Sequence, residues 1–162
     1  MPDIDPPEFD PPEFDPPEFD PSGFDLADFL PYQLAVAAAR VSRAFAERYR
    51  AEFGISIPEW RVLAHLAQAG AVSVREIHAR VDMDKSKVSR AAQRLVEAGH
   101  VEKRPHAEDG RLIDLRLTPD GAALVARILP IATEFQRELV SRLGPDGAGL
   151  KRALRRLMED PE

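Results

Sequence analysis

The sequence predicts a mainly α-helical protein that contains one small β-hairpin. Apolar residues recur at helical three- and four-residue spacing over most of the chain after residue 30. Two segments, 100–105 and 112–118, alternate apolar and polar residues as strands do, and a polar turn containing Gly110 separates them. Two helical segments joined by the short linker 82–84 precede this hairpin. This order is that of a winged helix-turn-helix with flanking helices at both ends.

Start and stop signals bound the helices that precede the hairpin. The first is expected at residues 31–53, and its apolar stripe consists of Leu34, Ala38, Val41, Phe45 and Tyr49. Ser is followed three residues later by Glu at 56–59 and again at 73–76, which is the capping-box pattern that opens a helix. In the fourth helix we expect Asp84 to cap the start and Gly99 to follow the end.

Two further helices are expected after the hairpin. Thr118 and Pro119 suit the N-cap and the first helical position, and Pro130 should kink the helix that follows or restart it. Gly144 and Pro145 precede the last helix. The helices at both ends carry more apolar surface than the central region could cover. Their expected partner is therefore the same pair of helices from a second subunit.

The net charge of −6 hides two regions of opposite sign. Residues 1–29 contain ten acidic and no basic residues, whereas the rest of the chain contains 18 acidic and all 22 basic residues, a net charge of +4. A mildly basic body is compatible with an anionic partner such as nucleic acid. The absence of Cys excludes disulfides, thiolate chemistry and Cys-ligated zinc.

The helix that follows the three-residue linker has two different faces. Val88, Ala92 and Leu95 recur at four- and three-residue spacing and are expected to face inward, with Ala91 on the flank. The opposite face carries basic residues and short donors, namely Lys85, Ser86, Lys87, Ser89, Arg90, Gln93 and Arg94. A basic helix after a tight turn is expected to enter the DNA major groove with its N-terminal half. The alternative is a charged face that is only solvated.

Three stretches of sequence form a specific combination. They are IPEWRVL at 57–63, MDKSKVSR at 83–90, and DGR at 109–111 followed by LRLTPDG at 115–121. Together they resemble the MarR-type (multiple antibiotic resistance regulator) family of transcriptional regulators, over about residues 30–160. The resemblance implies a dimeric winged helix-turn-helix, usually a repressor of neighbouring genes that small anionic aromatic ligands often release from DNA.

The resemblance also implies roles for single residues. Arg111 would be the wing arginine that enters the minor groove, and Asp109 the carboxylate that holds it. Gly110 stands where many relatives have a second Arg, so the wing is expected to bind less tightly. The residues expected to contact bases or phosphates are Ser86, Lys87, Ser89, Arg90 and Gln93. A two-fold dimer would place its recognition helices about 34 Å apart, on a pseudo-palindromic operator in double-stranded DNA.

The candidate effector-binding residues are Arg40, Arg43, Trp60 and His65. Arg40 and Arg43 lie one turn apart near the apolar stripe of the first helix. They form a surface or inter-subunit pair, or one of them meets a ligand carboxylate between the dimer helices and the DNA-binding lobe. Trp60 either packs in the core or lines the effector pocket. The four His residues are not spaced as metal ligands, so no metal site is expected.

Several classes of protein are not expected. No Gly-rich phosphate loop or catalytic constellation appears, so we expect neither an enzyme nor a cofactor. No apolar run is long enough for a membrane span and no signal sequence is expected, so the expected location is the cytoplasm. The alternatives to a ligand-responsive repressor are an effector-independent architectural DNA-binding protein and a protein-interaction adaptor.

The expected division of the chain has four parts. Residues 1–29 form an acidic tail, 30–54 an N-terminal dimerisation helix, 55–118 the winged helix-turn-helix DNA-binding lobe, and 119–162 the C-terminal dimerisation helices. The tail repeats DPPEF three times from residue 5 and then varies it. Its paired prolines and negative charge oppose collapse, so it is expected to be largely extended or disordered.

Three interpretations of the tail stay open: a solvated segment, a brake whose carboxylates compete with DNA phosphate for basic side chains, and a segment whose Phe rings dock on the partner subunit. The brake makes a clear prediction. Deleting residues 2–24 should tighten DNA binding at low salt and have less effect at high salt, because salt screens the competing charges. Fluorescence anisotropy with a labelled duplex measures both. Unchanged affinity at low salt would exclude the brake.

Overall fold

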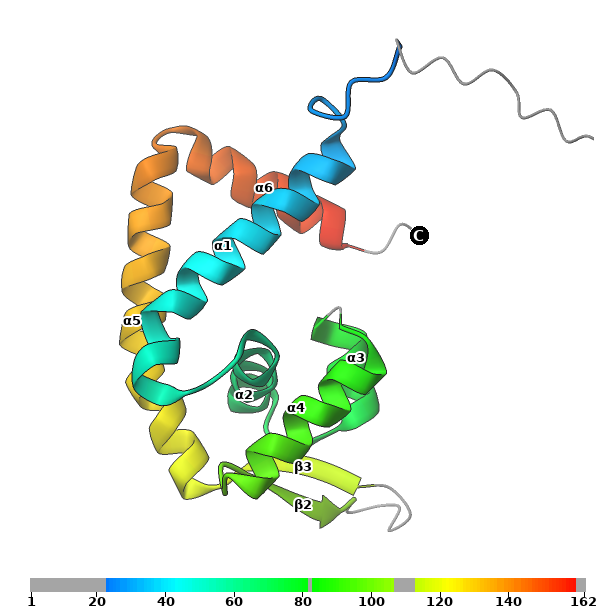
Figure 1. Ribbon diagram of the computed structural model, residues 1–162, viewed down its shortest axis with the longest axis vertical. Coiled ribbons are helices and arrows are strands. Elements are labelled where there is room, and N and C mark those ends of the chain that lie inside the picture. The colour runs from blue at the N-terminus through cyan, green and yellow to red at the C-terminus, as the bar shows by residue number, and fades with distance from the viewer. Residues whose placement is uncertain (1–22, 82, 107–112, 160–162) are drawn as a thin grey trace, which may run out of the picture. The chain divides into compact units, whose positions relative to one another are not determined.

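The structure is a computed structural model that describes residues 23–81, 83–106 and 113–159. Its elements are α1 (Leu30–Phe53), α2 (Ile57–Ala69), β1 (Val72–Ser73), α3 (Val74–Val81), α4 (Lys85–Glu97), β2 (Val101–Pro105), β3 (Ile113–Leu117), α5 (Pro119–Leu143) and α6 (Asp146–Met158) (Figure 1). These helices and their small sheet confirm the predicted winged helix-turn-helix class. No helix within the described ranges is both long and apolar enough to cross a membrane.

The chain divides into two compact units, residues 1–37 and residues 38–162, and α1 begins in the first and ends in the second. In the first unit, Asp25 Oδ1 accepts a hydrogen bond from the backbone N–H of Ala27 at 2.8 Å. The rings of Phe24 and Phe29 meet edge to face, with centroids 5.3 Å apart. The expectation of an extended repeat falls mostly on residues 1–22, which lie outside the described residues.

The wing is an antiparallel sheet of three strands in the order β1-β3-β2. The predicted hairpin is confirmed, because Val101–Pro105 pairs with Ile113–Leu117 along its whole length. β1 adds a third strand by pairing Val72 with Leu115. The sequence does not predict β1, since two residues are too few to show alternation. Leu115 at the centre of β3 is fully buried and attaches the wing to the core.

Both predicted capping boxes are present. At the start of α2, Ser56 N–H donates to Glu59 Oε2 at 2.7 Å and Glu59 N–H donates to Ser56 Oγ at 3.4 Å. At the start of α3, the same two hydrogen bonds join Ser73 and Glu76 at 2.8 and 3.2 Å. These bonds satisfy backbone donors that a helix start leaves without a partner. Local sequence therefore fixes where both helices begin.

α5 begins as predicted and continues through its internal proline. Thr118 Oγ accepts a hydrogen bond from Gly121 N–H at 3.0 Å, which caps the helix. Pro130 lies within α5, so the alternative in which it restarts the helix is wrong. Proline has no backbone N–H to donate. In the turn that contains Pro130, the Thr133 hydroxyl donates a hydrogen bond to the carbonyl of Leu129 at 2.9 Å.

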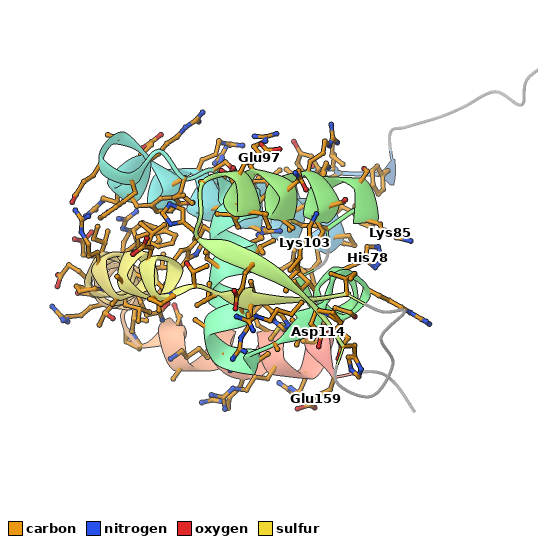
Figure 2. All side chains as sticks on the ribbon, turned by 90° about the horizontal axis from the view of Figure 1, so that it is seen from below. His78, Lys85, Glu97, Lys103, Asp114 and Glu159 are labelled. Atoms are coloured by element: carbon orange, nitrogen blue, oxygen red, sulfur yellow. The ribbon has the colours of Figure 1, made fainter. Side chains whose placement is uncertain are left out.

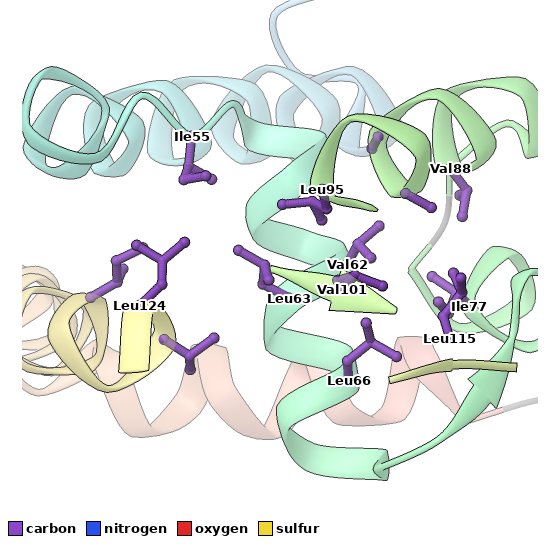
Figure 3. Close-up of a cluster of buried hydrophobic side chains, with 14 of the residues drawn as sticks. Ile55, Val62, Leu63, Leu66, Ile77, Val88, Leu95, Val101, Leu115 and Leu124 are labelled. Carbon is purple, nitrogen blue, oxygen red and sulfur yellow. The ribbon is translucent and has the colours of Figure 1, made fainter. Parts of the chain in front are cut away.

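One apolar core joins the helices of the lobe to the wing (Figure 3). Its largest fully buried side chains include Tyr49, Leu63, Leu66, Ile77, Leu95, Leu115 and Ile128. On α4, the predicted inward residues Val88, Ala92 and Leu95 are at most 2% exposed, and Ala91 is also buried. Burial of one Val or Leu side chain contributes roughly 1.5–3 kcal/mol. One face of α4 is therefore held by the core.

The flanking helices leave large apolar side chains exposed. The predicted stripe of α1 is fully buried at Tyr49, but Val41 is 37% exposed. On α5 and α6, the exposed large apolar residues are Leu129, Val140, Leu150, Leu154, Leu157 and Met158. Packing within the single chain does not cover these side chains, so the dimer interface stays a prediction that these helices support.

The first turn of α5 lies directly against the backbone at the end of α4. The carbonyl of His100 accepts a hydrogen bond from Thr118 N–H at 3.1 Å, and the Thr118 hydroxyl donates to Gly99 O at 2.7 Å. A Cβ placed on Gly121 would lie 1.9 Å from the same His100 oxygen. Only glycine permits this approach, because the clash is with backbone rather than with a flexible side chain.

Gly121→Ala should therefore lower the free energy of unfolding by about 1–3 kcal/mol, as overpacking does. Gly149→Ala is the matched control, because a Cβ there would meet only the far end of Arg152, 4.0 Å away, within α6. That variant should gain roughly 0.5–1 kcal/mol of helix stability. Urea unfolding monitored by circular dichroism measures both. Equal stability of the two variants would contradict the close approach.

Candidate nucleic-acid interface

The exposed face of α4 carries all seven residues predicted for it from the sequence. Lys85, Ser86, Lys87, Ser89, Arg90, Gln93 and Arg94 are exposed, whereas the opposite face is buried in the core. Figure 2 shows Lys85 and Glu97 at the two ends of the helix, with Lys103 of β2 beside it. The face therefore presents four positive charges and two hydroxyl groups on a rigid support. Such a surface is suited to an anionic polymer.

The start of α4 differs from the prediction in one respect. Asp84 occupies the N-cap position as predicted, but its side chain makes no capping hydrogen bond. Its carboxylate instead lies 2.9 Å from Lys87 Nζ, and this hydrogen-bonded ion pair lowers the pKa of Asp84. Both side chains are more than half exposed, so the pair contributes little stability and an anionic ligand can replace it.

Gln93 connects α4 to the wing. Its amide oxygen accepts a hydrogen bond from Lys103 Nζ at 2.7 Å, and its amide nitrogen donates to Glu97 at 2.9 Å. The amide oxygen and the amide nitrogen of Gln93 thus each have a partner within the protein in the absence of DNA. Sequence reasoning missed Lys103, although a signal exists. Lys103 lies two residues after the buried Val101, so it projects from the same face of β2.

The other face of the wing carries paired charges. Arg104 and Glu102 form two hydrogen bonds, at 2.8 and 3.1 Å, which lower the pKa of Glu102 and raise that of Arg104. Arg116 pairs with Glu102 across the sheet, and its Nε lies 3.9 Å from Glu102 Oε1. The predicted wing residues Asp109 and Arg111 lie outside the described residues, so their roles stay predictions.

Trp60 of α2 belongs to an aromatic cluster with side chains of α1 and α5. Its ring lies 5.6 Å from Phe45 and 5.9 Å from Tyr49, and Phe45 also contacts Phe135 of α5 at 5.3 Å. Tyr49 is fully buried, which raises its pKa to about 12, and its hydroxyl has no hydrogen-bond partner among the described residues. Trp60 is only partly buried, so it packs against the core and also reaches the surface.

The structure separates the candidate effector residues into different places. Trp60 and His65 line one open hollow on α2. Arg40 lines another, of about 290 Å³, between α1 and α5, whose other residues are Val41, Ala44, Glu47, Arg48, Phe135, Leu139 and Arg142. Arg43 lines neither hollow.

Within the second hollow, Arg48 is already paired. It forms two hydrogen bonds with Glu138, at 2.6 and 3.2 Å, which raise the pKa of Arg48 and lower that of Glu138. Arg40 makes no ion pair within the described part of the chain. The described residues contain no group of His, Asp and Glu that could hold a metal ion.

Comparison with known proteins gives consistent matches. The family model described as "MarR family" matches residues 53–112. The transcriptional repressor IacR of Pseudomonas putida is 32% identical, over 68% of this chain and 66% of that protein. The multiple antibiotic resistance protein MarR of Salmonella typhimurium is 30% identical, over 47% of this chain and 53% of that protein. The chain thus spans about half to two thirds of the length of these curated relatives.

Solved structures match over most of the chain. A MarR family transcriptional regulator from Silicibacter pomeroyi has a TM-score of 0.73 at 29% identity, covering 84% of this chain and 97% of that one. BpsR of Bordetella bronchiseptica has a TM-score of 0.74 at 23% identity, covering 86% and 99%. The second match, at its lower identity, bears on the fold alone.

Proposed function

Because this chain belongs to the MarR family, we propose that it is a DNA-binding transcriptional regulator of the repressor type. The observation that carries the proposal is the face of α4, where basic and hydroxyl side chains are exposed on a helix whose other face is buried. The curated relatives are named as transcriptional repressors and regulators, and we propose no catalytic activity. We propose that this chain acts on DNA in the cytoplasm.

The proposed active form is a homodimer. Residues 30–54 and 119–162 would supply the interface, because they carry the exposed apolar side chains of α1, α5 and α6, and residues 55–118 would bind DNA. A two-fold axis then presents two copies of α4 about one turn of DNA apart, roughly 34 Å, so the operator is a pseudo-palindrome. Burial of the exposed leucines supplies the driving force for association.

Two arginines test the DNA-binding proposal. Arg90→Ala on α4 and Arg111→Ala in the wing should each weaken operator binding by about 1–3 kcal/mol. The wild-type chain first selects its operator from a library of random duplexes, and anisotropy titrations then measure the affinities. Arg155→Ala on α6 removes the same charge outside residues 55–118 and serves as the control, once light scattering has verified that its oligomeric state is that of wild type. Wild-type affinity in both test variants would refute the assigned roles.

A small anionic effector is the second part of the proposal. DNA binding by the structurally similar BpsR is regulated by 6-hydroxynicotinic acid. In this chain, Arg40 stands beside Phe135 and Leu139 in the hollow between α1 and α5. A cation next to apolar side chains is suited to a carboxylate on an aromatic or acyl body. The open hollow on α2, which Trp60 and His65 line, is the other candidate site.

Titration with aromatic acids and acyl-thioesters tests the effector. A true effector should raise the melting temperature and release the operator together. Arg40→Ala should weaken its binding roughly tenfold or more, the loss expected for a charge-assisted hydrogen bond, whereas Arg43→Ala should leave it unchanged. Stabilisation without release would favour an architectural DNA-binding protein. If Arg40→Ala and Arg43→Ala changed effector affinity equally, the effector would bind elsewhere than in this hollow.

A further inference from the structure

A hollow of about 260 Å³ lies between α4 and the start of α2, and we call it the α2–α4 hollow. Its lining consists of Lys87, Arg90, Ala91 and Arg94 of α4 with Ser56 and Pro58 of α2. Three of these six residues are basic and none is acidic. The hollow therefore concentrates positive charge at one flank of α4.

The cations of this hollow share one stripe of the helix. Lys87, Arg90 and Arg94 follow one another at three- and four-residue spacing, which places them side by side along the flank. Ser86 belongs to the neighbouring stripe, on the side away from the hollow. Gln93 of that stripe is held by Lys103 and Glu97. The stripe of Ser86 and Gln93 and the stripe that lines the hollow are therefore different. Arg90 lies where the two stripes meet.

The three cations keep donors for a ligand. The side chain of Arg94 makes no hydrogen bond or ion pair with any described residue. Arg90 uses only Nε, which donates to the carbonyl of Ser86 at 3.2 Å. Lys87 is paired with Asp84, but that pair is solvent-exposed and weak. An oxyanion in the hollow would thus gain charge-assisted hydrogen bonds at little cost in existing contacts.

The α2 side of the hollow contributes shape rather than donors. The N–H and hydroxyl of Ser56 both bond Glu59, whose side chain is buried within the cap and does not line the hollow. Pro58 has no N–H to offer. Recognition in this hollow therefore comes from the guanidinium and ammonium groups of α4. Guanidinium groups match the oxygen geometry of phosphate in a bidentate manner.

We propose that the α2–α4 hollow seats one phosphate of the DNA backbone, with Arg94 as its principal ligand and Lys87 and Arg90 beside it. The assignment rests on the proposed function of the chain. A helix lying in the major groove has phosphates along its flanks and base edges in front of it. Arg94 then positions α4 in the groove without reading sequence, and Ser86 and Ser89 remain on the face directed at the bases.

Arg94→Gln in the full-length chain tests the seat. Arg155→Gln on α6, outside residues 55–118, is the control of equal charge, and light scattering verifies that both variants have the oligomeric state of wild type. Duplexes are the selected operator and a shuffled sequence of the same composition. Loss of a phosphate ligand should weaken binding of both duplexes by the same factor, roughly tenfold or more. It should also reduce the slope of log affinity against log salt by about 1.8, because the dimer loses two phosphate contacts at about 0.9 each. Arg94→Lys should restore the slope, because it restores the charge.

Neutral methylphosphonate substitutions, placed one at a time in the operator, then locate the phosphate. At the seated phosphate the substitution should weaken binding by wild type but not by Arg94→Gln, since that variant has already lost the contact. Additive losses at every position would overturn the proposal. So would a change in preference between the two duplexes, which would make Arg94 a base-reading residue. Unfolding midpoints verify that each variant is folded.

Two further outcomes separate the possible failures. Inorganic phosphate is titrated into the protein without DNA and followed by calorimetry. If phosphate binds saturably and Arg94→Gln removes that binding, while the same substitution leaves DNA affinity unaffected, the hollow serves a free anion and the backbone assignment is wrong. A wild-type chain that selects no sequence from the library overturns the regulator proposal itself. Selection by wild type with an unaffected Arg94→Gln overturns the seat alone.

Discussion

The burial of one face of α4 is the constraint on which the rest of the structure depends. Val88, Ala91, Ala92 and Leu95 are all at most 3% exposed, so the rotation of the helix about its axis is determined by the core. A rotation by one residue would bring a charged side chain into apolar surroundings, which is costly without a partner. The basic face is exposed because the opposite face is buried.

The same constraint divides the exposed face into parts with different neighbours. One flank adjoins the start of α2, where the capping box of Ser56 and Glu59 holds the helix end in place. The C-terminal half adjoins β2, where Lys103 binds Gln93. Neither neighbour contributes an acidic group to the hollow, because Glu59 is turned into its own cap. Charge on this surface is therefore arranged by local packing and not by net composition.

Sequence patterns predicted most of this architecture where the physics is local. The capping boxes, the inward residues of α4 and the hairpin all follow from spacings of two to four residues. Spacing along the sequence does not decide between competing hydrogen-bond partners. Asp84 has the right residue type for a cap, yet Lys87 one turn later takes its carboxylate. Gln93 has a donor and an acceptor suited to a base, yet residues of α4 and β2 occupy both.

α5 connects the lobe that carries α4 to the helices expected to form the dimer. Its first turn rests on the His100 carbonyl, and Leu124, Val125 and Ile128 enter the core of the lobe. Farther along, Glu138 pairs with Arg48 of α1, while Arg127 pairs with Glu52 at 2.9 Å and lies over the ring of Phe53. A continuous helix of 25 residues thus contacts both parts. Any shift of α1 against α5 changes these pairs or moves the lobe, so the proposed effector, if bound between the two helices, would act on the position of α4 through α5.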